Sequence, residues 1–281
     1  MMDMHETPGK EAGGAQSVDR ALALLSLVGQ GGGAPVPMAR LTEATSLSRP
    51  TVRRLMLALM RSGLIVQDHD SRAYALGPES YVLGVMARRR LDVLKVAMDS
   101  LVRLADESEE NTYLSLRRGT YSVCAHREEG SYPIRTQALK TGDRHPLGVG
   151  AGAMAILAAL PDCERAEVLE VIKPMLAEGY PGYTPEVVAQ CIADAQARGW
   201  ALNPGLYLSN SWAIGMAVRA PGFDDRPGEV LGAVSIAALD TRLKPDRQEA
   251  LAALLRREVG RIEQRLTHQM TGTARPLGGK P

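Results

Sequence analysis

The chain has 281 residues, of which 45% are hydrophobic, 23% charged and 4% aromatic, with a net charge of +1, a composition typical of a globular protein of one or two domains. It has no apolar run of roughly 18 residues, and residues 1–16 are polar with charges of both signs; we therefore expect no transmembrane helix and no signal peptide, but a disordered tail and a cytoplasmic protein. Three scattered cysteines, none in a C-x-x-C pair, argue against a disulfide framework and a metal site.

Two short helices are expected near the amino terminus. Ser17 is a good N-cap for a helix over 18–28, which the glycine-rich stretch 29–33 ends. A Pro-Val-Pro sequence then predicts a second helix over 38–44, because the first turn of a helix has no amide partner for proline to remove.

The third expected helix has an apolar face and a basic face. It follows a turn at 45–47, and Ser48 is placed to cap it. Its apolar residues recur at the spacing of one buried stripe, which consists of Val52, Leu55, Met56 and Leu59. The stretch 49–61 contains no acidic residue, and its basic residues, which lie off the stripe, are Arg49, Arg53, Arg54 and Arg61.

A hairpin and a further helix are expected next. The segments 64–67 and 72–77 flank a polar turn at 68–71, and this pattern predicts two short strands. A helix over 78–90 follows and ends in three consecutive arginines.

Beyond residue 92, helices and strands are mixed irregularly. Helices are expected over 93–107, 148–160, 185–198 and 245–267. Strands are expected over 111–116, 121–126, 132–137, 213–219 and 230–239. This order predicts an α+β domain rather than a doubly wound sheet.

Residues 38–62 have the parts of a helix-turn-helix, which are a supporting helix, a tight turn and a second helix with an exposed amino-terminal face. The arginine fork matches guanine O6 and N7, and its charge also suits phosphate. A charged helix face is usually only solvated, so the case for DNA binding depends on the three helices together with the hairpin as a wing. The charge distribution agrees, because residues 1–90 hold 11 Lys and Arg against 8 Asp and Glu, whereas the rest hold 22 against 24.

Several motifs resemble those of the IclR family of bacterial transcription regulators. In the first part of the chain these are Ser-Val-Asp-Arg-Ala-Leu at 17–22, the helix-turn-helix at 41–55, Gly-Leu-Ile at 63–65, Tyr-Ala-Leu-Gly at 74–77 and Leu-Gly at 83–84. In the second part they are Pro-Leu at 146–147, the alanine-rich segment 155–158, Gly-Trp-Ala at 199–201 and Val-Ser-Ile at 234–236. Each motif alone has low specificity for the family, but the order and spacing of all of them over residues 17–266 are specific.

The resemblance implies an α+β protein in which an N-terminal winged helix-turn-helix is joined by a linker helix to a GAF/PAS-like sensor domain. The expected organisation is a disordered tail at 1–16, a DNA-binding domain at 17–77, a linker helix at 78–92, an effector-binding domain at 93–270 and a flexible tail at 271–281. The resemblance also implies a homodimer, often paired into a homotetramer, on near-palindromic operator DNA. We expect a repressor controlled by a metabolite, with no cofactor, no metal and no membrane partner.

The motif positions give the candidates for DNA contact, which are Ser48, Arg49, Thr51, Arg53, Arg54 and Arg72. Arg49 and Arg53 are one turn apart on an exposed face, so we favour them for base edges. Ser48 and Thr51 are expected to contact phosphate. Arg72, in the wing, is expected to reach the adjacent backbone or the minor groove.

The resemblance also places a ligand cleft in the sensor domain, with candidate residues Ala151, Gly152, Asn203, Ala213, Ser235 and Ala237. The Gly/Ala stretch 148–153 has two interpretations of equal weight. Small residues let backbone amides approach a ligand, and the following helix N-terminus favours an anion. The alternative is close packing of backbone between helix and strand.

The sequence departs from the common family pattern in this cleft. Gly148 stands where a histidine is common, and Met154 where a lysine is common. The acidic pair usual after Gly-Tyr-Ala is replaced by Asn203-Pro204, and Ser-x-Ser ends in Ala237. These departures predict a less polar cleft and a larger effector, such as an aromatic or cyclic organic acid. Three further residues are candidates either for lining or for plain core: Tyr207, Trp212 and Met154.

No catalytic residue is predicted. The sequence has no H-E-x-x-H, G-x-S-x-G, Walker A or G-x-G-x-x-G motif. Cys124 and His126 share one face of an expected strand, and we interpret this pair as a packing coincidence. The alternative function is a ligand-independent DNA-binding protein, although such a protein would not need the long segment after the linker.

Overall fold

The computed structural model describes residues 15–31, 34–87, 93–134, 136, 138–222 and 228–273. The chain divides into two compact units, Met1–Arg89 and Arg90–Pro281. Most of the two expected tails and the end of the linker helix lie outside the described residues.

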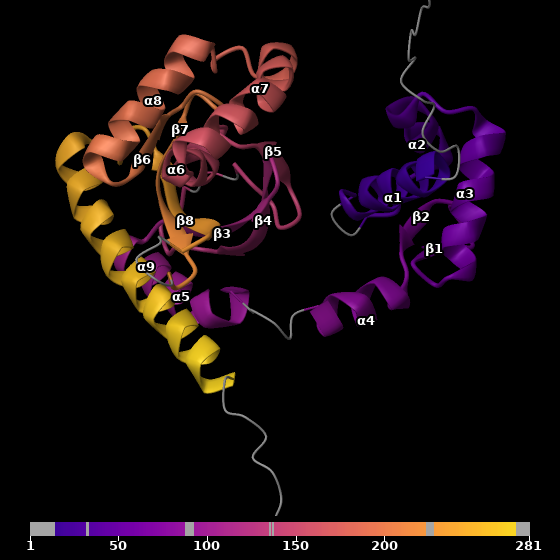
Figure 1. Cartoon of the computed structure of the whole chain (residues 1–281), viewed down its shortest axis with the longest axis horizontal. Coiled ribbons are helices and arrows are strands. Elements are labelled where there is room, and N and C mark those ends of the chain that lie inside the picture. The colour runs from indigo at the N-terminus through magenta and orange to yellow at the C-terminus, as the bar shows by residue number, and fades with distance from the viewer. Residues whose placement is uncertain are drawn as a thin grey trace, which may run out of the picture. The chain divides into compact units, whose positions relative to one another are not determined.

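In its described residues, the first unit has three helices, a two-stranded hairpin and a fourth helix (Figure 1). In chain order these are α1 (Ala15–Gly29), α2 (Met38–Thr45), α3 (Arg49–Arg61), β1 (Ile65–Gln67), β2 (Tyr74–Leu76) and α4 (Pro78–Ala87). The strands pair antiparallel, with Val66 opposite Ala75. Leu24, Leu41 and Met56 from the first three helices meet in the core. The unit is a winged helix-turn-helix, as the sequence predicts.

The expected start of α1 needs correction. Among the described residues, α1 already includes Ala15, so Ser17 lies within the helix and is not its N-cap. The buried residues of α3 are Val52, Leu55, Met56 and Leu59, which confirms the expected stripe.

The second unit is an α+β domain built on one antiparallel sheet. Its helices are α5 (Val93–Ser108), α6 (Gly150–Ala159), α7 (Asp162–Gly179), α8 (Pro185–Arg198) and α9 (Pro245–Thr273). Its strands are β3 (Asn111–Arg118), β4 (Tyr121–Glu128), β5 (Arg144–Pro146), β6 (Ala201–Pro204), β7 (Ser211–Arg219) and β8 (Val230–Leu239). The six strands lie in the order β5-β4-β3-β8-β7-β6.

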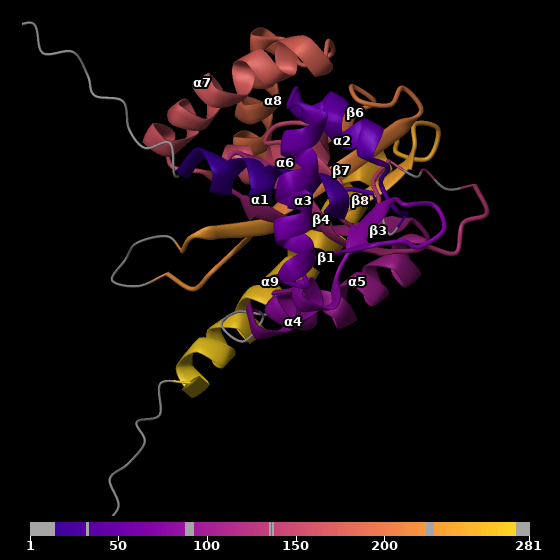
Figure 2. The same ribbon diagram turned by 90° about the vertical axis from the view of Figure 1, so that its right-hand side faces the viewer.

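The two faces of the sheet pack against different helices (Figures 1 and 2). Val234 and Ile236 of β8 pack with α5 and α9, whereas Ala233 packs with α6, α7 and α8. Successive side chains of a strand point to opposite faces. Ser235 and Ala237, which alternate with Val234 and Ile236, therefore face α6. The side chains on this face of the strand are small.

Two expected elements differ in the structure, and three further elements were not expected. The strand expected over 132–137 does not form among its described residues, because side chains hold this segment: the Thr136 carbonyl accepts hydrogen bonds from Asn111 Nδ2 (2.9 Å) and Tyr113 Oη (3.2 Å). Helix α7 and the short strands β5 and β6 were not expected; α7 contains Pro174, which weakens a sequence pattern for helix. The final helix continues to Thr273 rather than ending near 267.

A buried carboxylate joins α5 to α9. The Glu258 side chain is 0% exposed and accepts hydrogen bonds from Arg103 Nη2 (2.7 Å), Arg257 Nε (3.0 Å) and Arg261 Nη1 (2.6 Å). Burial by itself would raise the pKa of Glu258, but these hydrogen bonds outweigh it and lower the pKa to about 2. The ionised carboxylate therefore stabilises the fold.

We expect Glu258→Gln to lower the free energy of unfolding by about 2 kcal/mol near neutral pH, because a neutral amide cannot balance three guanidinium groups. The contribution of Glu258 is complete above its ordinary pKa of 4.5 and is lost as the pH falls toward 2, so the difference should shrink in acid. Urea denaturation at both pH values measures it, with the exposed Glu249→Gln on the same helix as the control. Equal stability of the Glu258 variant and the wild type would show that the network contributes nothing.

Candidate nucleic-acid interface and ligand cavity

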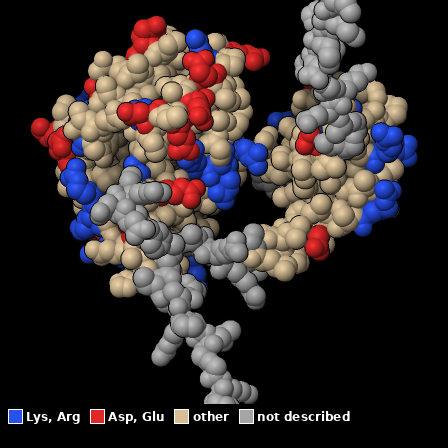
Figure 3. Space-filling view, viewed as in Figure 1, with Lys and Arg blue, Asp and Glu red and all other residues tan. Residues whose placement is uncertain are grey.

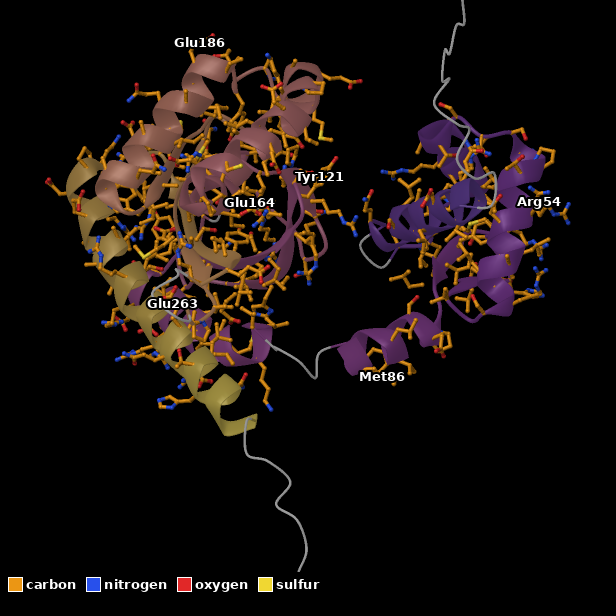
Figure 4. The ribbon with its side chains drawn as sticks, in the orientation of Figure 1. Arg54, Met86, Tyr121, Glu164, Glu186 and Glu263 are labelled. Atoms are coloured by element: carbon orange, nitrogen blue, oxygen red, sulfur yellow. The ribbon has the colours of Figure 1, made fainter. Side chains whose placement is uncertain are left out.

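The exposed face of α3 is basic. Arg49, Arg53 and Arg54 are exposed, and no residue in the described part of the chain pairs with their guanidinium groups. In Figure 4 the side chain of Arg54 points away from the body of the unit, and in Figure 3 Lys and Arg gather over α3. Unpaired arginines at the start of a helix-turn-helix's second helix are free to contact an external polyanion.

The start of α3 differs from the expectation in one respect. Ser48 occupies the N-cap position with an extended backbone, but its hydroxyl does not cap the helix. Instead Ser48 Oγ lies 2.9 Å from Thr51 Oγ1. The amides of the first turn, which lack partners within the helix, therefore remain available to a phosphate.

The wing tip is closed by its own hydrogen bonds. The Asp68 carboxylate accepts from Ser71 N (2.8 Å) and Ser71 Oγ (2.6 Å), and these bonds lower the pKa of Asp68. Gln67 Nε2 donates to the carbonyl oxygen of Arg72 (2.8 Å). Arg72 has a left-handed backbone, with φ of +57°, and an exposed side chain. A closed tip presents this guanidinium from a defined position.

In the second unit, all six expected ligand residues line one cavity, which is partly open to solvent. Ala151 and Gly152 come from α6, Asn203 from β6, Ala213 from β7, and Ser235 and Ala237 from β8. The structure thus brings together residues that lie far apart in the sequence. Five notable lining residues were not expected: Tyr113, Ser115, Cys124, Asp143 and His145.

The floor of the cavity is the first turn of α6. A side chain at Gly152 would meet the hydroxyls of two serines, because a Cβ there would lie 3.3 Å from Ser115 Oγ and 3.5 Å from Ser235 Oγ. On the neighbouring strand, a Cβ at Gly215 would lie 2.6 Å from the carbonyl oxygen of Ala151. Small residues therefore serve close backbone packing on one side of this turn and leave open space on the other.

A hydrogen-bonded tyrosine holds the start of α6. Tyr183 Oη accepts from Gly150 N (2.9 Å) and donates to Asn203 Oδ1 (3.3 Å). Asn203 Oδ1 also accepts from Leu206 N (3.1 Å). These bonds join α6, the segment between α7 and α8, and β6 around the cavity and fix the orientation of the amides that follow Gly150.

Aromatic rings form one wall of the cavity. The His145 ring lies edge-on to Tyr207 with ring centroids 4.9 Å apart, and its Nδ1 is 3.3 Å from Tyr180 Oη. Burial lowers the pKa of His145, which is 8% exposed, so the ring is neutral near pH 7. Of the three candidates for lining or core, only Tyr207 lines the cavity, since Met154 and Trp212 pack in the two hydrophobic cores.

The Cys124–His126 pair does not form a nucleophile. Burial raises the pKa of the Cys124 thiol to about 12, and its Sγ lies 3.6 Å from the carbonyl oxygen of His126. The His126 ring instead lies 3.0 Å from the Glu128 carboxylate. A protonated thiol away from the imidazole matches the interpretation of the pair as packing.

These two units, a winged helix-turn-helix with an unpaired basic face and an α+β domain with a cavity, are those of a DNA-binding transcription regulator with an effector domain. The family model of the IclR helix-turn-helix domain matches residues 17–69, and that of the C-terminal domain of bacterial IclR regulators matches residues 85–264. The chain belongs to the IclR family.

Named relatives are transcriptional regulators. The regulator KipR of Bacillus subtilis is 29% identical over 213 residues, 75% of this chain and 81% of KipR. The repressor AllR of Klebsiella pneumoniae is 26% identical over 249 residues, 86% of this chain and 87% of AllR.

Solved structures show the same fold. An IclR-type regulator from Silicibacter sp. TM1040 has a TM-score of 0.74 at 23% identity, covering 89% of this chain and 96% of its own. An IclR homologue from Microbacterium hydrocarbonoxydans, complexed with 4-hydroxybenzoate, has a TM-score of 0.69 at 19% identity, covering 90% and 99%. None of the helices in the described ranges has the length and apolar character needed to cross a membrane.

Proposed function

We propose that the chain is a repressor that binds near-palindromic operator DNA as a homodimer and responds to a small aromatic or cyclic acid. The observation that carries this proposal is the face of α3, where three exposed arginines have no partner among the described residues. The proposal includes a DNA-binding domain at 17–77, a linker helix at 78–92 and an effector-binding domain at 93–270. A cytoplasmic location follows from it, because a regulator must reach the chromosome.

The proposed DNA contacts follow the geometry of α3 and the wing. Arg49 and Arg53 read base edges, because they lie one turn apart at the exposed start of α3. Ser48 and Thr51, whose hydroxyls lie together beside the first-turn amides, contact phosphate. Arg72 at the wing tip contacts the adjacent backbone or minor groove. Arg54 adds charge beside them.

The proposed effector site is the cavity over α6. Its first-turn amides, with the hydroxyls of Ser115 and Ser235, can receive a carboxylate. Alanines at positions 151, 213 and 237 leave an apolar surface for a ring. The 4-hydroxybenzoate bound to the Microbacterium homologue supports an aromatic acid. A ligand-independent protein is the alternative, and the cavity argues against it.

The proposed dimer uses the apolar surface of the first unit. Tyr81 and Met86 on α4 are 75% and 64% exposed, and Leu83 between them is also exposed. On α1, Val18 and Leu22 are also exposed apolar residues. A second copy would cover these residues and place two α3 helices on one operator. The proposal includes the pairing of two dimers into a homotetramer. It also includes repression, which is the role that AllR's name gives.

Arg53→Ala tests the proposed base contact. We expect it to weaken specific operator binding by about 1–3 kcal/mol, with much less effect on random DNA, because a bidentate contact to guanine is lost. Fluorescence anisotropy with both DNAs measures it, and Arg61→Ala at the far end of α3 is the matched control. Equal weakening on both DNAs would make Arg53 a phosphate contact, and no weakening on either would overturn the proposed interface.

A further inference from the structure

The charge around the cavity is distributed unevenly. Among the described residues that line it, Asp143 is the one acidic side chain, and none is a lysine or arginine. Asp143 lies in the segment before β5, next to the neutral His145. At the other side of the cavity, the first turn of α6 presents the positive end of a helix. A ligand in this cavity therefore meets an anion-binding end and an end that accepts hydrogen bonds.

The strand order separates these two ends. Gly152 of α6 lies beside Ser115 of β3 and Ser235 of β8, in the middle of the sheet. His145 lies on the edge strand β5, where it pairs with Ser122 of β4. The edge strand is two strand spacings, or about 9.5 Å, from β3. A single aromatic ring with substituents at opposite positions fits between ends separated in this way.

The Asp143 carboxylate has acceptor capacity to spare. Its Oδ2 accepts one hydrogen bond, from Lys140 N (2.7 Å), which fixes the side chain in a turn. Its Oδ1 has no partner within the described ranges. An ionised carboxylate can only accept hydrogen bonds. The neighbouring His145 ring is held by Tyr180 and Tyr207, so this end of the cavity is preformed.

We propose that Asp143 selects an effector with a hydrogen-bond donor, a phenolic hydroxyl or aryl amine, opposite its carboxylate. The inference rests on the proposed function, since it assumes that an aromatic acid occupies the cavity. The ring then lies over the alanines at 151, 213 and 237. Its carboxylate faces the first turn of α6, and its donor faces Asp143 beside His145. An acid without a donor at that end leaves the carboxylate desolvated and unpaired, which weakens binding.

Calorimetric titration of the full-length protein with 4-hydroxybenzoate, 4-fluorobenzoate and 4-aminobenzoate tests the proposal. The hydroxy and fluoro groups are similar in size, but only the hydroxyl donates. We expect 4-hydroxybenzoate and 4-aminobenzoate to bind wild type at least about tenfold more tightly than 4-fluorobenzoate. Asp143→Asn keeps an oxygen for Lys140 N and should reduce this preference to less than about threefold. Asp106→Asn, an exposed position on α5, is the matched control and should leave the preference unchanged.

The outcomes separate this inference from the function on which it rests. If all three acids bind wild type equally, or if Asp143→Asn keeps the full preference, the role of Asp143 is overturned while an aromatic effector stands. If none of the acids binds wild type, the aromatic effector itself is overturned, and the inference falls with it.

Discussion

Tyr81→Glu combined with Met86→Glu should lower operator affinity by about 10²–10⁴-fold, because it places charges on the surface through which we propose that two copies associate. Each half-site would then be bound by a separate monomer, and the gain from linking two modules would be lost. Sedimentation velocity measures the loss of the dimer, and anisotropy on a full operator measures the loss of affinity.

The control for this variant changes two exposed apolar residues elsewhere. Val102→Glu combined with Ile134→Glu adds the same two charges to the second unit. We expect this control to remain a dimer with nearly wild-type operator affinity. A dimer that survives the α4 substitutions, or a monomer that binds the operator as tightly as wild type, would contradict the proposed interface.

Gly152→Leu should abolish effector binding and leave operator binding nearly unchanged. The backbone of Gly152 does not require glycine, but a Cβ there would already lie 3.3 Å from Ser115 Oγ. A leucine would extend between the two serines and occupy the place proposed for the carboxylate. We expect affinity for 4-hydroxybenzoate to fall by more than about 100-fold, since the site that orients the acid would be filled. Calorimetry measures this loss, and anisotropy measures operator binding.

Two further variants make this test graded. Gly152→Ala adds only the Cβ, so its loss of affinity should be intermediate. Gly179→Leu, at a position where a Cβ meets nothing within 4 Å, is the matched control and should bind the acid as wild type does. If Gly152→Leu has a native circular dichroism spectrum and binds 4-hydroxybenzoate as tightly as wild type, the first turn of α6 is not part of the effector site.

The helix-turn-helix is predictable from sequence because its signals are local. Val52, Leu55 and Met56 repeat at helical spacing within one turn, and the arginines beside them need no distant partner to be exposed. The same locality explains a small error. The hydroxyl of Ser48 is placed to cap α3, but Thr51 offers it a competing hydroxyl, which no pattern of spacing reveals.

The cavity is predictable only in part. The positions of Gly152 and Ser235 come from the family resemblance, because periodicity cannot show that α6 and β8 meet. Asp143 and His145 escape prediction, since they reach the cavity only through the pairing of β4 with the three-residue strand β5. That strand in turn replaces the one expected over 132–137, a segment held instead by side-chain hydrogen bonds to Thr136.

Binding of the purified protein to the DNA upstream of its own gene, against random competitor and across salt concentrations, tests the central claim most directly. The account predicts protection of a near-palindrome whose half-sites lie about one helical turn (~34 Å) or a multiple of it apart, with a preference over random DNA that persists as salt rises. Binding that is weak, steeply salt-dependent and independent of DNA sequence would show that the α3 arginines contribute only non-specific electrostatic attraction. No binding at any salt by the folded protein would contradict the account.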